Sequence, residues 1–380
     1  MKKQMKRIIA LLLALCLLLG CTALAEEDEE EISLDDLMQS VGMTEDDDLL
    51  IEDEEELFIG EDIQEELSLL DQDMELDETV SVADLELNPN LPENVINILL
   101  IGIDTREGTV TSETRNSVRG DVQMILSVNT EDGSVKLSSI LRDSYVTIPG
   151  YKNKNKINAA YGRGGGELAM RTINHNFAMN IQYYATINFY GLASIIDAIG
   201  GIDVDMTRVE AGAINTYLRK HPPAYDNTDG SERVPLEKKA GVQHLDGVQA
   251  VMYARLREID NDFARTARQR HLMELLLGKV MQDMDMNKLM TLINTALPFV
   301  TTNVNASTIF NLALGVLKSD IISRARSGGE LLGQFRIPMD KSYSYKNING
   351  ASVVNMSDSS LKRNTQALHE FIYGAYYPAK

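Results

Sequence analysis

The chain has 380 residues, enough for one large domain or two ordinary ones, and its formal net charge is −21. From Glu26 to Glu93 there are 29 acidic residues and no lysine or arginine, whereas the chain from Asn94 onward has 28 acidic and 32 basic residues. The acidic total therefore does not exclude a polyanionic partner for this later part, whose net charge is +4. Both cysteines, Cys16 and Cys21, lie near the N-terminus, which excludes a disulfide or a cysteine nucleophile further along.

The N-terminus has the pattern of an export signal, with a basic start, an apolar run over residues 8–19 and small residues after it. Three outcomes stay open. Residues 23–25 form an Ala-Leu-Ala site for ordinary cleavage, residues 18–21 resemble a lipobox that would place a lipid on Cys21, and residues 8–25 are long enough to span a bilayer uncleaved. We therefore expect a location outside the cytoplasm, at the outer face of the membrane or in the cell wall. Cleavage after residue 25 would give a secreted form.

Residues 26–93 are expected to form a disordered acidic linker, because like charges repel and little apolar surface is available for a core. A solvated spacer is the simplest interpretation, and a regulatory or cation-binding tail is the alternative. Residues 88–92, Asn-Pro-Asn-Leu-Pro, indicate a turn-rich boundary. We expect a single domain over residues 94–378.

The first predicted element after this boundary is a strand over residues 95–103, whose continuous apolar run is typical of burial on both faces. The elements predicted next are strands over 122–128 and 135–140, a helix over 167–179, a strand over 183–187, a helix ending at Gly200-Gly201 and a strand over 202–206. This alternation predicts a layered α/β/α fold with a central mixed β-sheet.

The second half of the chain continues the alternation. Residues 208–239 are polar and irregular, so we expect an insertion loop. Asp246 and Gln249 have the spacing of a capping box, which predicts a short helix. The remaining predictions are a longer helix over 263–281, strands near 333–337 and 351–355, and a terminal helix.

Two aspartates are expected at one edge of this sheet. Asp104 directly follows the first strand, with Arg106 close behind, and Arg119 and Asp121 directly precede the second strand. If the two strands are antiparallel neighbours, both carboxylates meet where ligands bind in α/β sheets. Such a pair suits a hard divalent cation, Mg²⁺ or alternatively Mn²⁺, completed by phosphate oxygens. A single aspartate at a strand end is ordinarily a turn or cap, and the flanking arginines favour the binding site.

Further basic residues follow the strands. Arg142 and Asp143 come directly after the third strand, and Arg255 and Arg257 have the spacing that points side chains the same way in an extended segment. Lys156 is a further candidate cation, although a solvated lysine is the more common outcome.

The helix over 263–281 begins with arginines on its apolar face. Arg265, Arg268 and Gln269 share that face with Leu272, so we expect them on the packed side. Cations are unfavourable in the first turn of a helix, which indicates a multiply charged anion bound by backbone N–H groups and guanidinium groups. The structural alternative is a set of salt bridges to Glu258, Asp260 and Asp262.

Several other chemistries are missing from the sequence. There is no phosphate-binding P-loop, no G-x-S-x-G nucleophile elbow and no zinc-like grouping of the five histidines. A nucleic-acid partner is not expected for an exported protein behind a polyanionic segment.

Six stretches, taken in order, resemble the LytR-CpsA-Psr family of wall glycopolymer ligases. They are IGIDTR (101–106), RGD (119–121), SILRDS (139–144), KINAAY (156–161), IGGIDV (199–204) and the run from LDG through YARLR to DNDFARTARQR (245–270). The likeness covers about residues 95–280 nearly continuously. Gly120 and Val122 stand where the family usually has Ser or Thr, and Leu141 replaces a common Pro; none of these departures removes a charge.

The resemblance implies transfer of a glycosyl phosphate from a polyprenyl-pyrophosphate carrier to a peptidoglycan hydroxyl at the outer face of the cell membrane. It implies that Asp104 and Asp121 hold Mg²⁺ against the pyrophosphate. The arginines that it places around the pyrophosphate are Arg119, Arg142, Arg255, Arg257, Arg265 and Arg268. We expect Asp143, or an aspartate near the metal, to act as general base, and Arg106, Lys156 and Gln269 to bind substrate.

The polyprenyl tail needs an apolar groove, which we expect along the helices after Glu167 and around Ile195. Two rival functions stay open. A pyrophosphatase would use the same site with water as acceptor, and a non-catalytic regulatory protein would only bind the lipid pyrophosphate. The sequence does not show whether the polymer is teichoic acid, capsule or another glycan.

Overall fold

The structure is a computed structural model that describes residues 84–103, 118–220, 233–256, 259, 262–283, 299–304 and 332–379. A six-stranded mixed sheet lies at its centre, in the order β10-β3-β2-β1-β6-β9. Its strands are β1 (Val95–Ile103), β2 (Gly120–Asn129), β3 (Val135–Ile140), β6 (Tyr183–Asn188), β9 (Val300–Thr302) and β10 (Gly333–Ile337). β2 is antiparallel to both β1 and β3, whereas β6 is parallel to β1 and β10 is parallel to β3. The predicted central mixed sheet is therefore confirmed.

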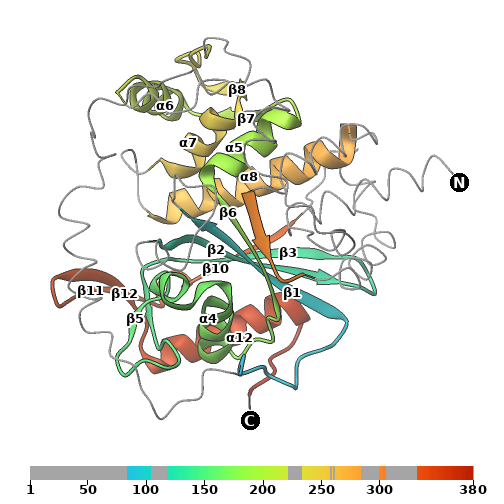
Figure 1. The fold of residues 1–380 in the computed structure, drawn as a ribbon, viewed down its shortest axis with the longest axis vertical. Helices are drawn as coiled ribbons and strands as arrows, with labels where there is room; N and C mark the ends of the chain where they lie inside the picture. The colour runs from blue at the N-terminus through green and yellow to red at the C-terminus, as the bar shows by residue number, and fades with distance from the viewer. Residues whose placement is uncertain are drawn as a thin grey trace, which may run out of the picture.

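Helices cover both faces of this sheet (Figure 1). Helices α4 (Ala159–Phe177) and α12 (Asp358–Tyr373) pack on one face. Helices α5 (Phe189–Ala198) and α8 (Asp262–Asp283) pack on the other, with α7 (Gly247–Arg255) against them. Successive side chains of a strand point to opposite faces. Leu99 accordingly joins the core beneath α4 and α12, while Leu100 points toward α5 and α8. This explains the continuous apolar run of β1.

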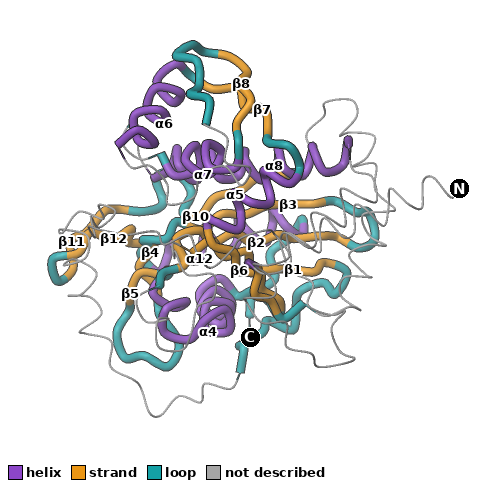
Figure 2. The backbone as a smooth tube through the Cα atoms, turned by 45° about the horizontal axis from the view of Figure 1, so that its top comes forward, coloured by secondary structure: helices purple, strands orange, loops and turns teal. Residues whose placement is uncertain are grey.

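Two smaller sheets flank the central one. Strands β4 (Ser144–Val146), β5 (Asn155–Lys156), β11 (Ser344–Ile348) and β12 (Ala351–Asn355) form the order β11-β12-β4-β5. Strands β7 (Ile202–Met206) and β8 (Gly241–Leu245) form a two-stranded antiparallel sheet, which stands with helix α6 (Arg208–Lys220) beyond α7 (Figure 2).

Helix α6 corrects the predicted insertion loop over residues 208–239. Residues 208–220 of the predicted loop form this helix, while residues 221–232 lie outside the described residues. The signal for the helix is a narrow apolar stripe, because Ala211 and Ile214 are buried at a spacing of three and Leu218 packs beside them.

Other boundaries differ in smaller ways. The predicted strands over 135–140, 202–206, 333–337 and 351–355 are confirmed, and Asp246 forms the predicted capping box with Gln249. Helix α4 begins at Ala159, before the predicted residue 167, and bends at Gly164 and Gly165, whose backbone angles are not helical. Arg255 is the last residue of α7 rather than part of an extended segment, so the spacing argument that paired it with Arg257 is wrong.

Residues before the predicted boundary at residue 94 also contact the domain. The Glu86 carboxylate lies 2.9 Å from the Arg171 guanidinium, and the Asn88 side-chain amide donates to the carbonyl oxygens of Ala178 and Tyr377. Residues 84–93 therefore pack against the domain instead of belonging to the acidic linker. Among the described helices, none combines the length and apolarity needed to cross a membrane.

His369 in α12 provides a test of this packing. It is fully buried, its Nε2 donates to the Phe177 carbonyl, and its Nδ1 accepts from the Tyr377 N–H, so the ring is held neutral. Burial lowers the pKa of His369 below its ordinary value of 6.5, despite opposing hydrogen bonds from the backbone. Its contribution to stability is therefore present above about pH 6.5 and is lost as the pH falls toward the lower folded-state pKa.

We predict that the free energy of unfolding, measured by urea titration at a series of pH values, declines below pH 6.5. In His369→Gln this decline should become shallower, while stability at neutral pH falls by about 1–3 kcal/mol because buried hydrogen bonds are lost. Equal slopes in the two proteins would show that His369 does not govern the pH dependence.

Candidate functional site

Charged side chains gather at one edge of the central sheet. Ile103 at the end of β1 pairs with Gly120 at the start of β2, which confirms the expected antiparallel arrangement. Arg119 and Asp121 therefore lie at the same edge as the end of β1, and Arg142 and Asp143, which follow β3, arrive at that edge as well. The consecutive strands β2 and β3 thus bring their polar residues to one edge of the sheet.

Arg142 is the centre of this group. Its Nη1 lies 2.8 Å from Asp121 Oδ1, and its Nε lies 3.5 Å from Asp143 Oδ2. Lys156 Nζ, from β5, lies 3.2 Å from Asp143 Oδ1. The Lys156 side chain is only 8% exposed, so it is a buried member of the site rather than a solvated lysine. The backbone holds the same segments together, because Asn158 N–H donates to the Arg142 carbonyl and Gly120 N–H donates to the Asn158 carbonyl.

The start of α8 completes the group. Arg265 and Gln269 are buried, which confirms that they lie on the packed face of the helix. Arg265 Nη1 lies 3.0 Å from Asp262 Oδ1, so one of the salt bridges of the structural alternative is present. The helix contacts β3. The charge of Arg265 lowers the pKa of Asp143, and the charge of Asp262 raises the pKa of Arg142, so the start of the helix belongs to the same group of charges. We name the set of Asp121, Arg142, Asp143, Lys156, Asp262 and Arg265 the charged cluster.

The surrounding charges fix the protonation of Asp143 and Arg142. Burial by itself raises the pKa of Asp143, but Arg142, Lys156 and Arg265 together hold it below its ordinary value of 3.8. Burial works against the charged form of Arg142, but Asp121, Asp143 and Asp262 raise its pKa above the ordinary value. Asp143 is consequently ionised and a weak proton acceptor at neutral pH, whereas a good general base has a pKa near the working pH. This argues against the expected role of Asp143 as the base.

Arg268 belongs to a different network. Its Nη1 lies 3.5 Å from Glu210 Oε1 on α6, and its Nη2 donates to the Leu256 carbonyl at 2.6 Å. Burial and Glu210 raise the pKa of neighbouring Tyr253 to about 12, with Arg268 acting in the opposite direction. These two contacts join Arg268 of α8 to α6 and to Leu256, the residue that follows α7.

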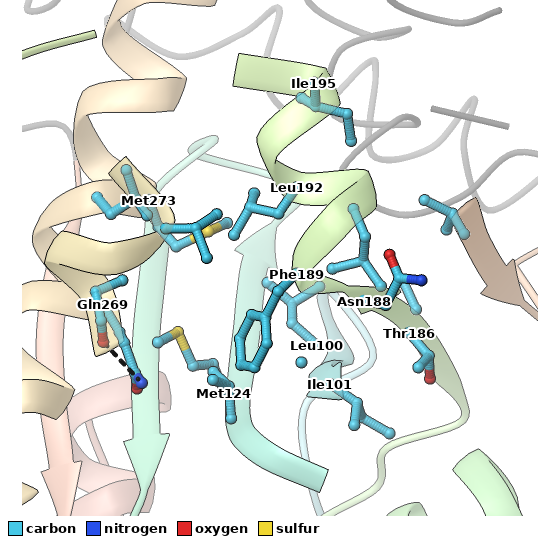
Figure 3. A pocket seen from close by; sticks show the side chains of 18 residues that line it. Leu100, Ile101, Met124, Thr186, Asn188, Phe189, Leu192, Ile195, Gln269 and Met273 are labelled. Atoms are coloured by element: carbon cyan, nitrogen blue, oxygen red, sulfur yellow. Dashed lines mark hydrogen bonds between the residues drawn. The ribbon is translucent and has the colours of Figure 1, made fainter. Parts of the chain in front are cut away.

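An apolar cavity lies between α5, α7, α8 and the strands β1, β2 and β6 (Figure 3). Its lining includes Val122, which directly follows Asp121, and Gln269, which lies one helical turn after Arg265. It contains about 820 Å³ of empty space, part of it open to solvent. Side chains of Met124, Phe189, Leu192 and Met273 point into it (Figure 3). Gly102 also lines it, and a Cβ there would lie 2.9 Å from the Cβ of Val122. The strands can therefore form a smooth wall at this point.

Polar residues stand at the boundary of the cavity. The Arg255 guanidinium lies 4.4 Å from the centre of the Phe189 ring, and Gln269 lines the cavity beside Leu272. The expected groove around Ile195 is confirmed, because Ile195 is part of the lining. The expected contribution of the helix after Glu167 is wrong, since α4 packs on the opposite face of the sheet.

The remaining site predictions divide into two groups. Asp104, Arg106 and Arg257 lie outside the described residues. Among the residues that the structure describes, no three His, Cys, Asp or Glu side chains form a group that could hold a metal ion. The Asp121 carboxylate at the strand edge is partly exposed, at 21%, which fits a cation such as Mg²⁺ that takes one or two carboxylates and completes its shell with phosphate oxygens.

Phe189 was missed as a site residue. Its signal in the sequence is its position directly after the strand over 183–187, where ligand-binding residues are expected. Asp262 was considered only as a salt-bridge partner, and its effect on Arg142 could not be read from spacing along one helix.

Comparisons with known proteins place the fold. The chain is 33% identical over 214 residues to an Enterococcus faecalis protein named polyisoprenyl-teichoic acid–peptidoglycan teichoic acid transferase TagU, covering 56% of this chain and 61% of the relative. It is 28% identical over 279 residues to the Staphylococcus aureus regulatory protein MsrR, covering 73% of this chain and 74% of that protein. The chain thus spans less than two thirds of the length of TagU.

A solved structure of the LytR-CPS2A-psr family protein YwtF (TagT) contains octaprenyl pyrophosphate lipid. TagT is a Bacillus subtilis protein. The superposition has a TM-score of 0.51 at 18% identity, covers 77% of this chain and 99% of that chain, and shows that the fold is shared. The LytR_cpsA_psr family model matches residues 62–370, which is most of the chain. The protein therefore belongs to the LytR_cpsA_psr family.

Proposed function

We propose that this protein transfers a glycosyl phosphate from a polyprenyl-pyrophosphate carrier to a hydroxyl of peptidoglycan, outside the cytoplasmic membrane. The observation that supports this most directly is the contact of Arg255 with Phe189, which places a guanidinium cation beside a residue that lines the apolar cavity. An amphiphilic ligand with a charged head and a long apolar tail fits such a boundary. The name of TagU and the lipid bound to TagT support the same class of donor.

The donor would place its tail in the cavity and its pyrophosphate against the arginines. The cavity lining is almost wholly apolar, with residues such as Leu100, Met124 and Leu192. Burying the prenyl chain there is favourable by about 0.8 kcal/mol for each CH₂ group. Arg142 and Arg265 offer planar guanidinium groups that match phosphate oxygens. A lipid carrier would also keep the protein at the membrane surface, in agreement with the export signal of the sequence.

The charged cluster supplies orientation. Phosphoryl transfer depends mainly on positioning and on stabilising the charge that develops in the transition state. Arg142 is held on two sides by Asp121 and Asp143, so its direction is fixed before substrate binds. We assign Asp143 a positioning role for Arg142 and Lys156. When bound at Asp121, with Asp104 as its sequence-predicted partner, Mg²⁺ or Mn²⁺ would neutralise non-bridging phosphate oxygens.

Replacing Arg142 by lysine tests the positioning role. The substitution keeps the charge but removes the planar fork that meets both Asp121 and the phosphate. We predict that kcat for transfer of a lipid-linked sugar to peptidoglycan oligomers falls by about 10²-fold, with a melting temperature that still reports a folded domain. The matched control is Arg208→Lys on the exposed start of α6, which should keep full activity. Unchanged transfer in Arg142→Lys would contradict the assignment.

Filling the cavity tests the donor tail. Ala185 on β6 lines the cavity and is buried, so Ala185→Leu adds three carbon atoms and removes space for up to about three CH₂ groups. We predict that the KM for an octaprenyl donor rises about tenfold, while a geranyl donor, whose short tail does not need that space, keeps its KM. The short donor serves as internal control for folding. An equal change for both donors would show that the tail lies elsewhere.

Metal removal tests the role of Asp121. We predict that chelation stops transfer and that added Mg²⁺ restores it, with Asp121→Asn needing about tenfold more metal because one charge is lost. Mn²⁺ binding followed by electron paramagnetic resonance gives a readout that does not depend on activity. Equal Mn²⁺ affinity in the parent protein and Asp121→Asn would remove Asp121 from the metal site.

A further inference from the structure

A cluster of aromatic rings stands beside the charged cluster, on the β11 side. The Phe263 and Tyr343 ring centres are 4.9 Å apart, and Tyr345 meets Tyr343 edge-to-face at 5.7 Å. The Arg336 guanidinium lies 4.0 Å from the centre of the Phe263 ring. We name Phe263, Arg336, Tyr343 and Tyr345 the aromatic shelf. None of these residues takes part in the proposed chemistry so far.

Backbone hydrogen bonds fix the shelf to the site. Val354 N–H on β12 donates to the Asp143 carbonyl at 2.8 Å, and Tyr345 on β11 is the register partner of Val354. Asp143 and Tyr345 are thus separated by two strand spacings, on the order of 10 Å between backbones. At the other end, Phe263 directly follows Asp262 of the charged cluster. Burial and Tyr343 raise the pKa of Tyr345, and the negative charges of Asp262 and Asp143 contribute in the same direction.

The shelf and the apolar cavity lie on opposite sides of the charged cluster. Along the sheet, the cavity covers β2, β1 and β6, Arg142 follows β3, and Arg336 lies on β10 at the outer edge. Along α8, Phe263 comes first, Arg265 second and the cavity residue Leu272 last. Figures 1 and 2 show the β11–β12 hairpin on the side away from β6. The order along the sheet and the order along α8 therefore agree: the aromatic shelf comes first, the charged cluster next and the cavity last.

The shelf offers one exposed ring and one cation. Tyr345 is 58% exposed, which is unusual for a large aromatic side chain that also packs against another ring. Arg336, whose side chain is 18% exposed, pairs with Asp340, but that carboxylate is 84% exposed, so solvent weakens the pair. A ligand with a flat face and an acidic group suits both features.

We propose that the aromatic shelf binds the acceptor glycan, stacking one sugar ring on Tyr345 and meeting a carboxylate of the peptide attached to that glycan with Arg336. The inference rests on the proposed transfer function for its choice of acceptor over donor. In a displacement at phosphorus the attacking and leaving oxygens are roughly in line. The lipid phosphate leaves toward the cavity, so the attacking hydroxyl arrives from the opposite side, where the shelf lies.

Binding of a soluble acceptor fragment, measured without any lipid donor, tests this directly. The probe, called the disaccharide below, is N-acetylglucosaminyl-N-acetylmuramic acid carrying the first two residues of the stem peptide, with a free carboxylate on that peptide, titrated by calorimetry or ligand-observed NMR. We expect Tyr345→Ala to weaken binding by about tenfold, because a ring contact is lost. Tyr345→Phe keeps the ring and should bind as the parent protein does. Tyr345 is exposed, so neither change is expected to unfold the domain.

The role of the carboxylate is tested with the methyl ester of the same disaccharide, in which that carboxylate has lost its charge. The parent protein should prefer the free acid by about tenfold, and Arg336→Gln should lose that preference. In the transfer reaction, Tyr345→Ala should raise the KM of the acceptor and leave the KM of the lipid donor unchanged.

Unaltered disaccharide binding in Tyr345→Ala would overturn the proposal. So would binding of the donor's glycosyl phosphate at the shelf in place of the disaccharide. If no transfer occurs with any acceptor, yet the disaccharide binds and the two variants behave as expected, the proposed function fails while the glycan site stands.

Discussion

The ion pair between Arg142 and Asp121 ties the end of β3 to the start of β2, and the rest of the site is arranged around it. Both side chains are largely buried, and buried charges are costly unless they are paired and hydrogen-bonded. Asp143, Lys156, Asp262 and Arg265 supply the remaining partners from β5 and α8. Because these groups fix each other, the guanidinium groups are oriented before any substrate binds. A preorganised cationic edge is what transfer at phosphorus requires.

Helix α8 turns this local cluster into a directional site. Its first residues contribute to the aromatic shelf, Arg265 contributes to the charged cluster, and Leu272 and Met273 line the apolar cavity. The pleat of β1 adds the second requirement, since Leu99 and Leu100 point to opposite faces and leave one face available for the cavity. An acceptor, a pyrophosphate and a lipid tail can therefore be accommodated in a line along one helix.

The sequence predicted the features that depend on local pattern. The alternation and apolar run of residues 95–103 predicted a doubly buried strand, and the helical phase of Arg265 and Gln269 predicted their burial. Contacts between distant segments could not be obtained in this way. Arg268 shares the phase of Arg265, yet it pairs with Glu210, because α6 lies where a loop was expected. Tyr345 stands on a short polar strand whose pairing with β12 leaves no clear pattern in the sequence.

The central claim is that the acceptor of the glycosyl phosphate is a peptidoglycan hydroxyl and not water. The most direct measurement is mass analysis of the products after the protein is incubated with Mg²⁺, a polyprenyl-pyrophosphoryl sugar and peptidoglycan oligomers in isotopically labelled water. The account predicts an oligomer heavier by one glycosyl phosphate, without label in the phosphate. Free glycosyl phosphate that contains the label, with no modified oligomer, would contradict it.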